Sequence, residues 1–129
     1  MSRHPLILVT FDGLATEPEF DDYLDKMTRQ VLDRKQKSVT ILDARTSGRA
    51  PATQRKKQAE WLKRHDALLR QYSLGSAFVI NSPLVRGVLT AIFWLQPMAT
   101  AYTIVGTLPE AETWAATRLR DAVLQVPGR

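Results

Sequence analysis

Short runs of apolar residues alternate along the chain with longer segments in which apolar positions recur every three or four residues. The short runs have the length and the β-branched content that are typical of strands, and residues that favour turns follow them. The pattern predicts four strands, at residues 6–11, 38–44, 75–81 and 100–105.

The longer segments have the periodicity of amphipathic helices. The first and the last begin at a threonine that is followed three residues later by a glutamate, which is the spacing of a capping box. We therefore expect capping boxes at Thr16–Glu19 and at Thr107–Glu110. The predicted helices span residues 16–35, 52–72, 84–96 and 107–124.

Four repeats of a strand followed by a helix predict an α/β fold, in which a mostly parallel sheet of four to five strands is flanked by about four helices. Such a sheet buries its strands on both faces, and the continuous apolar runs at 6–11 and 77–80 fit that arrangement. No linker or internal repeat divides the chain, so residues 1–129 are predicted to form a single domain.

Charge is unevenly distributed over a chain whose formal net charge is +5. Residues 12–25 contain six acidic residues and no basic residue, whereas residues 45–70 contain eight basic residues and two acidic ones. This distribution predicts either an acidic and a basic face that steer a partner, or two ordinary solvated helix faces.

The absence of cysteine excludes disulfides, thiol catalysis and thiolate metal sites, and it favours a reducing, cytoplasmic location. The apolar run near the N-terminus is shorter than a signal peptide or a membrane span requires, so we expect no membrane span.

The remaining residues offer little catalytic chemistry. Two histidines are present, and His65 falls on the apolar side of the predicted helix 52–72, where we expect it to be packed in the core. The chain has no G-x-S-x-G, G-x-G-x-x-G or Walker motif, which are the usual marks of hydrolases and nucleotide-binding proteins. We therefore expect no enzymatic activity, no catalytic residue, no metal and no cofactor.

Polar side chains follow three of the predicted strands, at the sheet edge where open α/β folds gather functional groups. These residues are Asp12, Asp43 and Asn81, and Arg86 lies on the helix after the third strand. Two such acids also occur in phospho-accepting receiver domains, but Gly13 stands where a receiver needs a second acid. We therefore expect turn and capping roles for this strand-end polar cluster.

The predicted helix 52–72 carries a basic stripe on the side away from its apolar face. A stripe of this kind can bind the phosphates of a nucleic acid, yet no aromatic residue is interleaved with it to stack on bases. We expect a solvated face that is open to a protein partner, and no nucleic-acid partner. The stripe consists of Lys56, Lys57, Lys63, Arg64 and Arg70.

Four short features follow one another along the chain, and their order and spacing are moderately specific. They are Phe11-Asp12-Gly13, Leu42-Asp43, Arg86, and the segment 111–114. In this order and spacing the chain, over about residues 6–120, resembles STAS-like domains. The most similar are stand-alone STAS/SEC14-type bacterial proteins, which are distantly related to anti-anti-sigma factors. The resemblance implies a sheet flanked by helices and a non-enzymatic protein that acts through partners.

In the phospho-switch members of that family, a serine near the start of the second helix, within an Asp-Ser-Ser-Gly motif, is phosphorylated. The resemblance carries over only to a position, Ser47 or Thr53, because Thr46-Ser47-Gly48 lacks the aspartate of the motif. The alternative is that Ser47 belongs to a turn and Thr53 only starts the helix. The chain also lacks the leading strand of fuller STAS domains, which implies an open sheet edge.

The predicted helix 84–96 is apolar almost all round, because Arg86, Gly87 and Thr90 are its only non-apolar positions before the end. A helix of this kind must be covered on more than the side that faces the sheet. The last helix, a second protein chain and a lipid are the three alternatives. The residues expected at a partner or dimer interface are Leu89, Ile92, Phe93 and Trp94.

These patterns and the resemblance together predict a regulatory or scaffold domain that acts through protein–protein contacts, with a homodimer as the simplest partner. The partner's identity and the pathway do not follow from the residues. The alternative is a carrier domain for a small ligand or lipid. A carrier would contain an apolar cavity, and a scaffold domain needs none.

Overall fold

The computed structural model describes residues 6–48 and 50–124. Within these residues four strands form one sheet in the order β1-β2-β3-β4, and every neighbouring pair is parallel. The predicted α/β fold with a parallel sheet is therefore confirmed. The strands are β1 (Leu6–Gly13), β2 (Ser38–Ser47), β3 (Ser73–Val79) and β4 (Tyr102–Val105).

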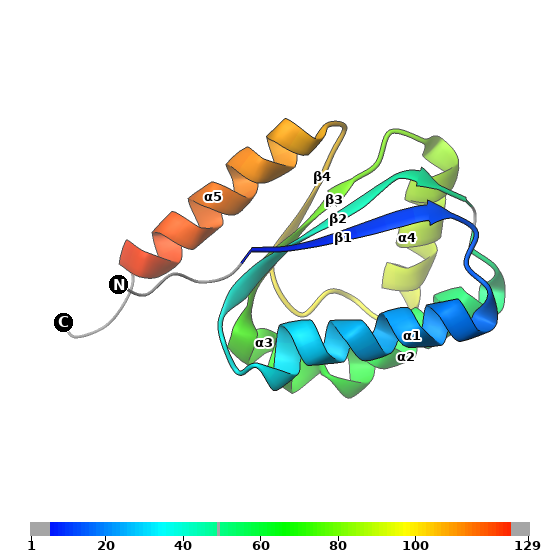
Figure 1. Cartoon of the computed structure of the whole chain (residues 1–129), viewed down its shortest axis with the longest axis horizontal. Coiled ribbons are helices and arrows are strands. Elements are labelled where there is room, and N and C mark those ends of the chain that lie inside the picture. Colours follow the sequence, from blue (N-terminus) through cyan, green and yellow to red (C-terminus); the bar gives the residue numbers. More distant parts are fainter. Residues whose placement is uncertain (1–5, 49, 125–129) are drawn as a thin grey trace.

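Helical segments connect the strands and follow the last one (Figure 1). The first connection contains an α-helix that continues into a wider π-helical segment, and the second contains two consecutive helices. In the described part of the chain they are α1 (Glu17–Met27), the π-helical η1 (Thr28–Asp33), α2 (Ala52–Arg64), α3 (Asp66–Tyr72), α4 (Pro83–Leu95) and α5 (Leu108–Leu124).

The helices lie on two sides of the sheet. Consecutive parallel strands in sequential order, joined by crossovers of one hand, place all the connecting helices on the same face. Helices α1, α2, α3 and α4 accordingly share one face, and α5 lies alone on the other, as Figure 1 shows. We call these the helix-layer face and the α5 face.

The α5 face is closely packed because small residues meet there. Ala111 and Ala115 of α5 are fully buried against the strands. At Gly75, with a φ of +149°, a Cβ atom would lie 2.6 Å from the indole of Trp114. The strand residues on this face include Val39, Ile41, Ala77 and Val79.

The helix-layer face is built from larger side chains. Phe78 of β3 packs with residues of α4, and Trp61 of α2 is buried among α1, η1 and α3. The indole nitrogen of Trp61 donates to the Thr28 hydroxyl at 3.0 Å, which ties α2 to η1. Helix α5 lies closer to the strands than α1, α2 and α4 do.

The helix boundaries follow the predicted signals. The capping box at Thr16–Glu19 is confirmed in both of its hydrogen bonds. At Thr107–Glu110 one half forms, since the Thr107 hydroxyl accepts from the Glu110 backbone N–H at 3.3 Å, but the Glu110 carboxylate accepts from that hydroxyl at 2.9 Å and not from the Thr107 backbone N–H. The predicted helix 52–72 is interrupted at His65, whose backbone leaves the helical conformation. None of the helices within the described residues has the length and hydropathy that a membrane crossing requires.

The prediction that β1 is buried on both faces is wrong. Leu6 is 48% exposed and Leu8 is 58% exposed, although both belong to an uninterrupted apolar run. Their side chains point to the α5 face, where Leu8 is in register with Ile41. Because α5 packs on β2, β3 and β4, it leaves the edge strand β1 uncovered on this side.

The alternative in which the last helix covers α4 is also wrong. Val85 and Leu89 of α4 pack on Phe78 and Ile80, whereas Ala111 of α5 belongs to the cluster on the opposite face. The sheet therefore separates the two helices, and the outer side of α4 has to be covered in another way or face solvent.

Candidate functional site

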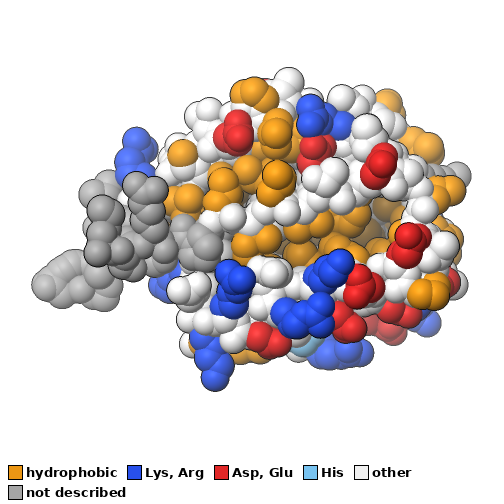
Figure 2. Space-filling model, in the orientation of Figure 1, with side chains coloured by type: hydrophobic (Ala, Val, Ile, Leu, Met, Phe, Trp, Pro, Cys, Tyr) orange, Lys and Arg blue, Asp and Glu red, His pale blue; other side chains and the backbone are white. Residues whose placement is uncertain are grey.

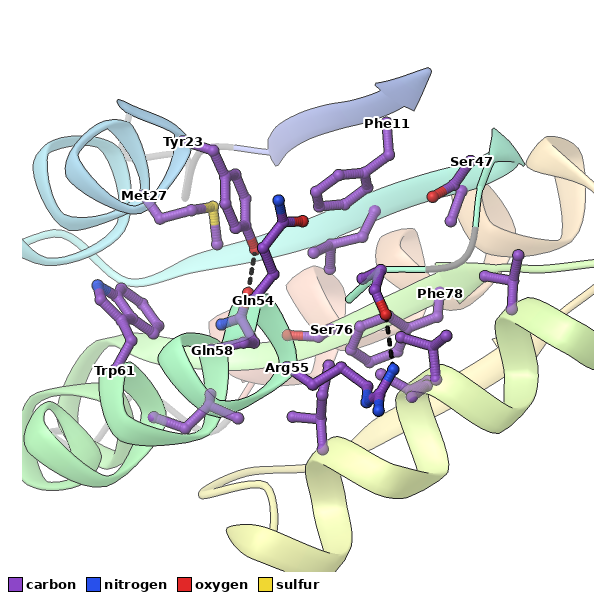
Figure 3. Close-up of a pocket in the computed structure, with 18 of the residues that line it drawn as sticks. Phe11, Tyr23, Met27, Ser47, Gln54, Arg55, Gln58, Trp61, Ser76 and Phe78 are labelled. Carbon is purple, nitrogen blue, oxygen red and sulfur yellow. Dashed lines mark hydrogen bonds between the residues drawn. The ribbon is translucent and has the colours of Figure 1, made fainter. Parts of the chain in front are cut away.

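A cavity of about 190 Å³ separates the sheet from helices α1, α2 and α4. The sheet contributes Leu42 and Phe78 to its lining, and the helices contribute Met27, Trp61 and Ile92. Figure 3 shows Phe78 on the sheet and Met27 and Trp61 on the helices facing the same space. Because these five side chains are apolar and buried, the cavity is an apolar space within the domain.

The cavity is large enough to hold a small ligand. Protein interiors rarely leave voids that exceed one water molecule. An apolar cavity of about 150 Å³ in another protein holds a benzene molecule, so a space of about 190 Å³ can accept a molecule of at least that size. The cavity is therefore the strongest candidate for a binding site in the described part of the chain.

Two adjacent hydroxyl groups are among those that interrupt the apolar floor of the cavity. Thr40 of β2 and Ser76 of β3 are adjacent in the register of the sheet, and both side chains are buried and line the cavity. Their neighbours on the opposite face, Ile41 and Ala77, are apolar and belong to the close packing under α5. The hydroxyls give the interior of the cavity a pair of polar anchors.

A tyrosine and a glutamine close the cavity between α1 and α2. The Tyr23 hydroxyl donates to the side-chain oxygen of Gln58 at 2.8 Å, as the dashed line in Figure 3 shows. Burial raises the pKa of the Tyr23 phenol above its usual range, so the group stays neutral. This side of the cavity therefore carries no charge and can border an apolar ligand.

Gln54 fixes the loop that leads from β1 into α1. Its buried side-chain amide donates to the Ala15 carbonyl at 2.9 Å and to the Glu17 carboxylate at 2.8 Å. The hydrogen bond from Gln54, and then that from Lys57, hold the pKa of the Glu17 carboxyl below its usual value. The amide therefore holds α1 and the start of α2 together beside the cavity.

Two loops form the end of the cavity nearest the carboxyl ends of β1 and β2. Gly13 ends β1 and is followed by Leu14 and Ala15, and Ser47 ends β2 and is followed by Gly48. The Gly48 N–H donates to the Gly13 carbonyl at 2.9 Å and joins them. Because Leu14 is exposed, the cavity reaches the surface at this end, and Figure 2 shows a hydrophobic hollow between β1 and α1.

The strand-end polar cluster is not assembled as one site. Asp43 accepts two hydrogen bonds from the guanidinium of Arg45, at 2.9 and 2.7 Å, on the α5 face. This partner holds the pKa of the Asp43 carboxyl below its usual value. Asp12, Asn81 and Arg86 are exposed, and no side-chain hydrogen bond or ion pair among the described residues joins them to Asp43.

The basic stripe is divided between solvent and internal ion pairs. Lys57 bridges two carboxylates of α1, Glu17 at 3.0 Å and Asp21 at 2.9 Å, so the acidic and the basic segments meet at this point. Arg70 pairs with Asp66 on α3. Of the two alternatives, an acidic face that is separate from a basic face therefore does not hold where α1 meets α2. The residues of the stripe that are exposed and outside these pairs are Lys56, Lys63 and Arg64.

The two candidate phosphorylation positions differ in their surroundings. Ser47 ends β2, its hydroxyl donates to the Gly48 carbonyl at 3.1 Å, and it lines the cavity. Thr53 is exposed on the first turn of α2. Phosphorylation at either residue stays a prediction.

The residues expected at an interface on α4 do not share one face. Leu89 and Ile92 are buried and line the cavity, and Phe93 is half-buried beside Phe78 with ring centroids 5.9 Å apart. Trp94 is 84% exposed and is the member of this set that a partner can reach.

His65 is half-buried at the break between α2 and α3, with its ring centroid 5.0 Å from that of Trp61. Burial, and then the charge of Arg64, lower the pKa of its imidazole. In the described part of the chain no three His, Asp or Glu side chains gather closely enough to hold a metal ion.

The cavity itself was not predicted from the residues. The residues that could have indicated it are Thr40 and Ser76. Both are hydroxyl residues that interrupt apolar strands, and they lie opposite each other in the register of β2 and β3. Gln54 was a second signal, since it is a buried amide at the start of a basic helix. Comparison of the chain with protein-family models, with curated proteins and with solved structures found no match, so the STAS-like resemblance stays a prediction.

Proposed function

We propose that this protein binds a small, largely apolar molecule in the cavity between its sheet and helices α1, α2 and α4. The protein then serves as a carrier or sensor domain for that molecule. The observation that carries the proposal is the cavity of about 190 Å³ with its apolar lining and its opening beside the β1–α1 loop.

The position of the cavity supports the proposal. In open α/β sheets, ligands bind near the carboxyl ends of the strands, and the opening lies at that end of β1 and β2. A mostly apolar pocket with a few polar groups is the usual form of a small-molecule site, and Thr40, Ser76 and Tyr23 are such groups here.

The chemistry of the lining favours binding over catalysis. Among the described residues, the lining contains no histidine, and its one carboxylate is Asp12. The Ser47 hydroxyl donates to a backbone carbonyl rather than to a base, so the arrangement that activates a serine nucleophile is missing there.

The test is calorimetric titration with 1-octanol, an uncharged eight-carbon ligand. Burying its chain contributes roughly 6 kcal/mol, part of which offsets the cost of association, so we expect one saturable site with a dissociation constant no tighter than roughly 100 µM. Ala44 lines the cavity, and Ala44→Leu should weaken binding by filling it. Trp94→Ala is the matched control on the surface and should leave binding unchanged. Equal binding by wild type and Ala44→Leu would contradict the proposal.

Protein–protein contact through the outer side of α4 is a second candidate function. Trp94 and the exposed Leu84 and Leu95 lie on this helix, and α5 does not cover them. An exposed tryptophan beside other apolar residues is typical of interface anchors. A second copy of the chain, related by a twofold axis, is the simplest partner, and this is the regulatory or scaffold function that the residues predict.

Sedimentation across a concentration series tests this second candidate. We expect a wild-type dimer that Trp94→Glu converts into a folded monomer. Leu68→Glu is the matched control, because Leu68 is also an exposed apolar residue but lies on α3. A wild type that stays monomeric at its highest soluble concentration would contradict self-association.

A further inference from the structure

We infer that the molecule bound in the cavity is an amphiphile with an acidic head group, which the guanidinium of Arg55 binds at the open end. The inference rests on the proposed function, because it names the class of the ligand that the cavity accepts. Arg55 would then determine whether the cavity binds a charged ligand more tightly than an uncharged one.

Among the described residues that line the cavity, Arg55 is the one with a cationic side chain. Only part of its hydrogen-bonding capacity is used within the protein. One nitrogen of its guanidinium donates to the Ala50 carbonyl at 2.6 Å. A guanidinium has five N–H donors, so most of its donors remain for another acceptor. No carboxylate of the described residues lies within 4.0 Å of it.

Two cations near Arg55 have carboxylate partners, whereas the unpaired Lys56, Lys63 and Arg64 of α2 are exposed and do not line the cavity. Arg45 is paired with Asp43, and Lys57 is paired with Glu17 and Asp21. Arg55 lies two residues from Lys57 on α2, yet it turns to the cavity. Its charge is therefore available to a ligand that enters the cavity.

The direction of the side chain places the charge beside the apolar space. Figure 3 shows Arg55 extending from α2 toward α4, with its guanidinium near the side chains that line the cavity. The same lining continues inward to Trp61 and Ile92. A ligand whose chain occupies the apolar part can thus place its head group against Arg55.

An oxyanion fits this position better than a neutral group does. The planar fork of a guanidinium binds a carboxylate or a phosphate through two parallel hydrogen bonds, and such charge-assisted bonds are stronger than neutral ones. Asp12 also lines the rim, and it forms no ion pair with Arg55 within 4.0 Å. The ligand class is therefore a short-chain or medium-chain acid with a carboxylate or a phosphate head.

The experiment compares octanoate, monooctyl phosphate and 1-octanol, which share one chain and differ in the head group, at neutral pH by calorimetry. For wild type we expect at least one of the two anions to bind about tenfold more tightly than 1-octanol. The anion that does so identifies the head group as carboxylate or phosphate. Arg55→Leu should remove this preference, and Arg55→Lys should retain part of it.

The controls separate the inference from the proposed function. Lys56→Leu removes the neighbouring exposed cation, which does not line the cavity, and should leave all three affinities unchanged. Binding of 1-octanol by Arg55→Leu, within about twofold of wild type, shows that the cavity of the variant is intact. If 1-octanol binds but neither anion is preferred, or the preference survives Arg55→Leu, the inference is wrong and the proposed function stands. If no ligand binds to wild type, both are wrong.

Discussion

The two faces of the sheet differ in how closely their helices pack against the strands. On the α5 face, small residues such as Ala111, Ala115 and Gly75 let one helix approach the strands closely, and Val39 and Val79 become fully buried. On the helix-layer face, large side chains hold α1, α2 and α4 farther from the strands. A cavity of about 190 Å³ remains between them.

Large apolar side chains therefore do not by themselves fill a core. Shape complementarity decides whether the space between two layers is closed. Large side chains act as spacers at the borders of the cavity, namely Trp61, Phe78 and Ile92. On the other face, Ala111 and Ala115 of α5 fit directly against the strands. The closely packed face stabilises the sheet, and the open face provides room for a ligand.

The largest expected effect concerns the spacers of the helix-layer face. Trp61→Ala should destabilise the protein by about 3–5 kcal/mol, because it removes a buried indole and its hydrogen bond to Thr28. Urea unfolding followed by circular dichroism measures this change. Trp94→Ala is the matched control and should stay within about 0.5 kcal/mol of wild type, since Trp94 is exposed. Equal losses in the two variants would show that Trp61 does not support this layer.

A pair of identical substitutions compares the two faces directly. Ala115→Leu should cost about 1–3 kcal/mol, because the α5 face has no room for the added carbons. Ala44→Leu places the same carbons into the cavity and should change stability by less than about 1 kcal/mol. Thermal unfolding of both variants measures the difference. A larger loss for Ala44→Leu than for Ala115→Leu would reverse the comparison.

The smallest expected effect concerns the ion pair on the α5 side. The folded pKa of Asp43 lies below its unfolded value of about 4, so the stabilising contribution of the carboxylate is present above that value. It is lost as the pH falls through the lower, folded pKa. Asp43→Asn should therefore lower the melting temperature at pH 7, and this difference should shrink below about pH 4.

Melting temperatures between pH 7 and pH 2 test this dependence. Asp12→Asn is the control, because Asp12 is exposed and none of the ion pairs among the described residues includes it. A difference between wild type and Asp43→Asn that persists unchanged at the lowest pH would mean that the charge of Asp43 is not what stabilises the fold.

The order of the elements was predictable because local signals mark it. The capping residues at Thr16 and the apolar strand cores place each element within a few residues of its observed bounds. The exposure of Leu6 and Leu8 was not predictable, because their exposure depends on how far α5 reaches across the sheet. An apolar run alone cannot distinguish an edge strand from a central one.

The candidate site was less predictable than the fold. A cavity depends on distances between layers, which no local pattern encodes, and its lining comes from segments far apart in the chain. The hydroxyls of Thr40 and Ser76 and the buried Gln54 were visible as polar residues in apolar surroundings. That Arg55 faces the cavity, while Lys57 two residues later pairs with α1, required the structure.

The measurement that tests the central claim most directly is an NMR search for intermolecular nuclear Overhauser effects between bound 1-octanol and the methyl groups of the protein. If the helix-layer face holds the ligand, the octanol chain should contact Leu42, Leu89 and Ile92, all of which line the cavity. It should give no effect at Val39 or Val79, which are buried on the α5 face. Contacts confined to the exposed Leu6 and Leu8 of β1, or no saturable contact at all, would contradict the account.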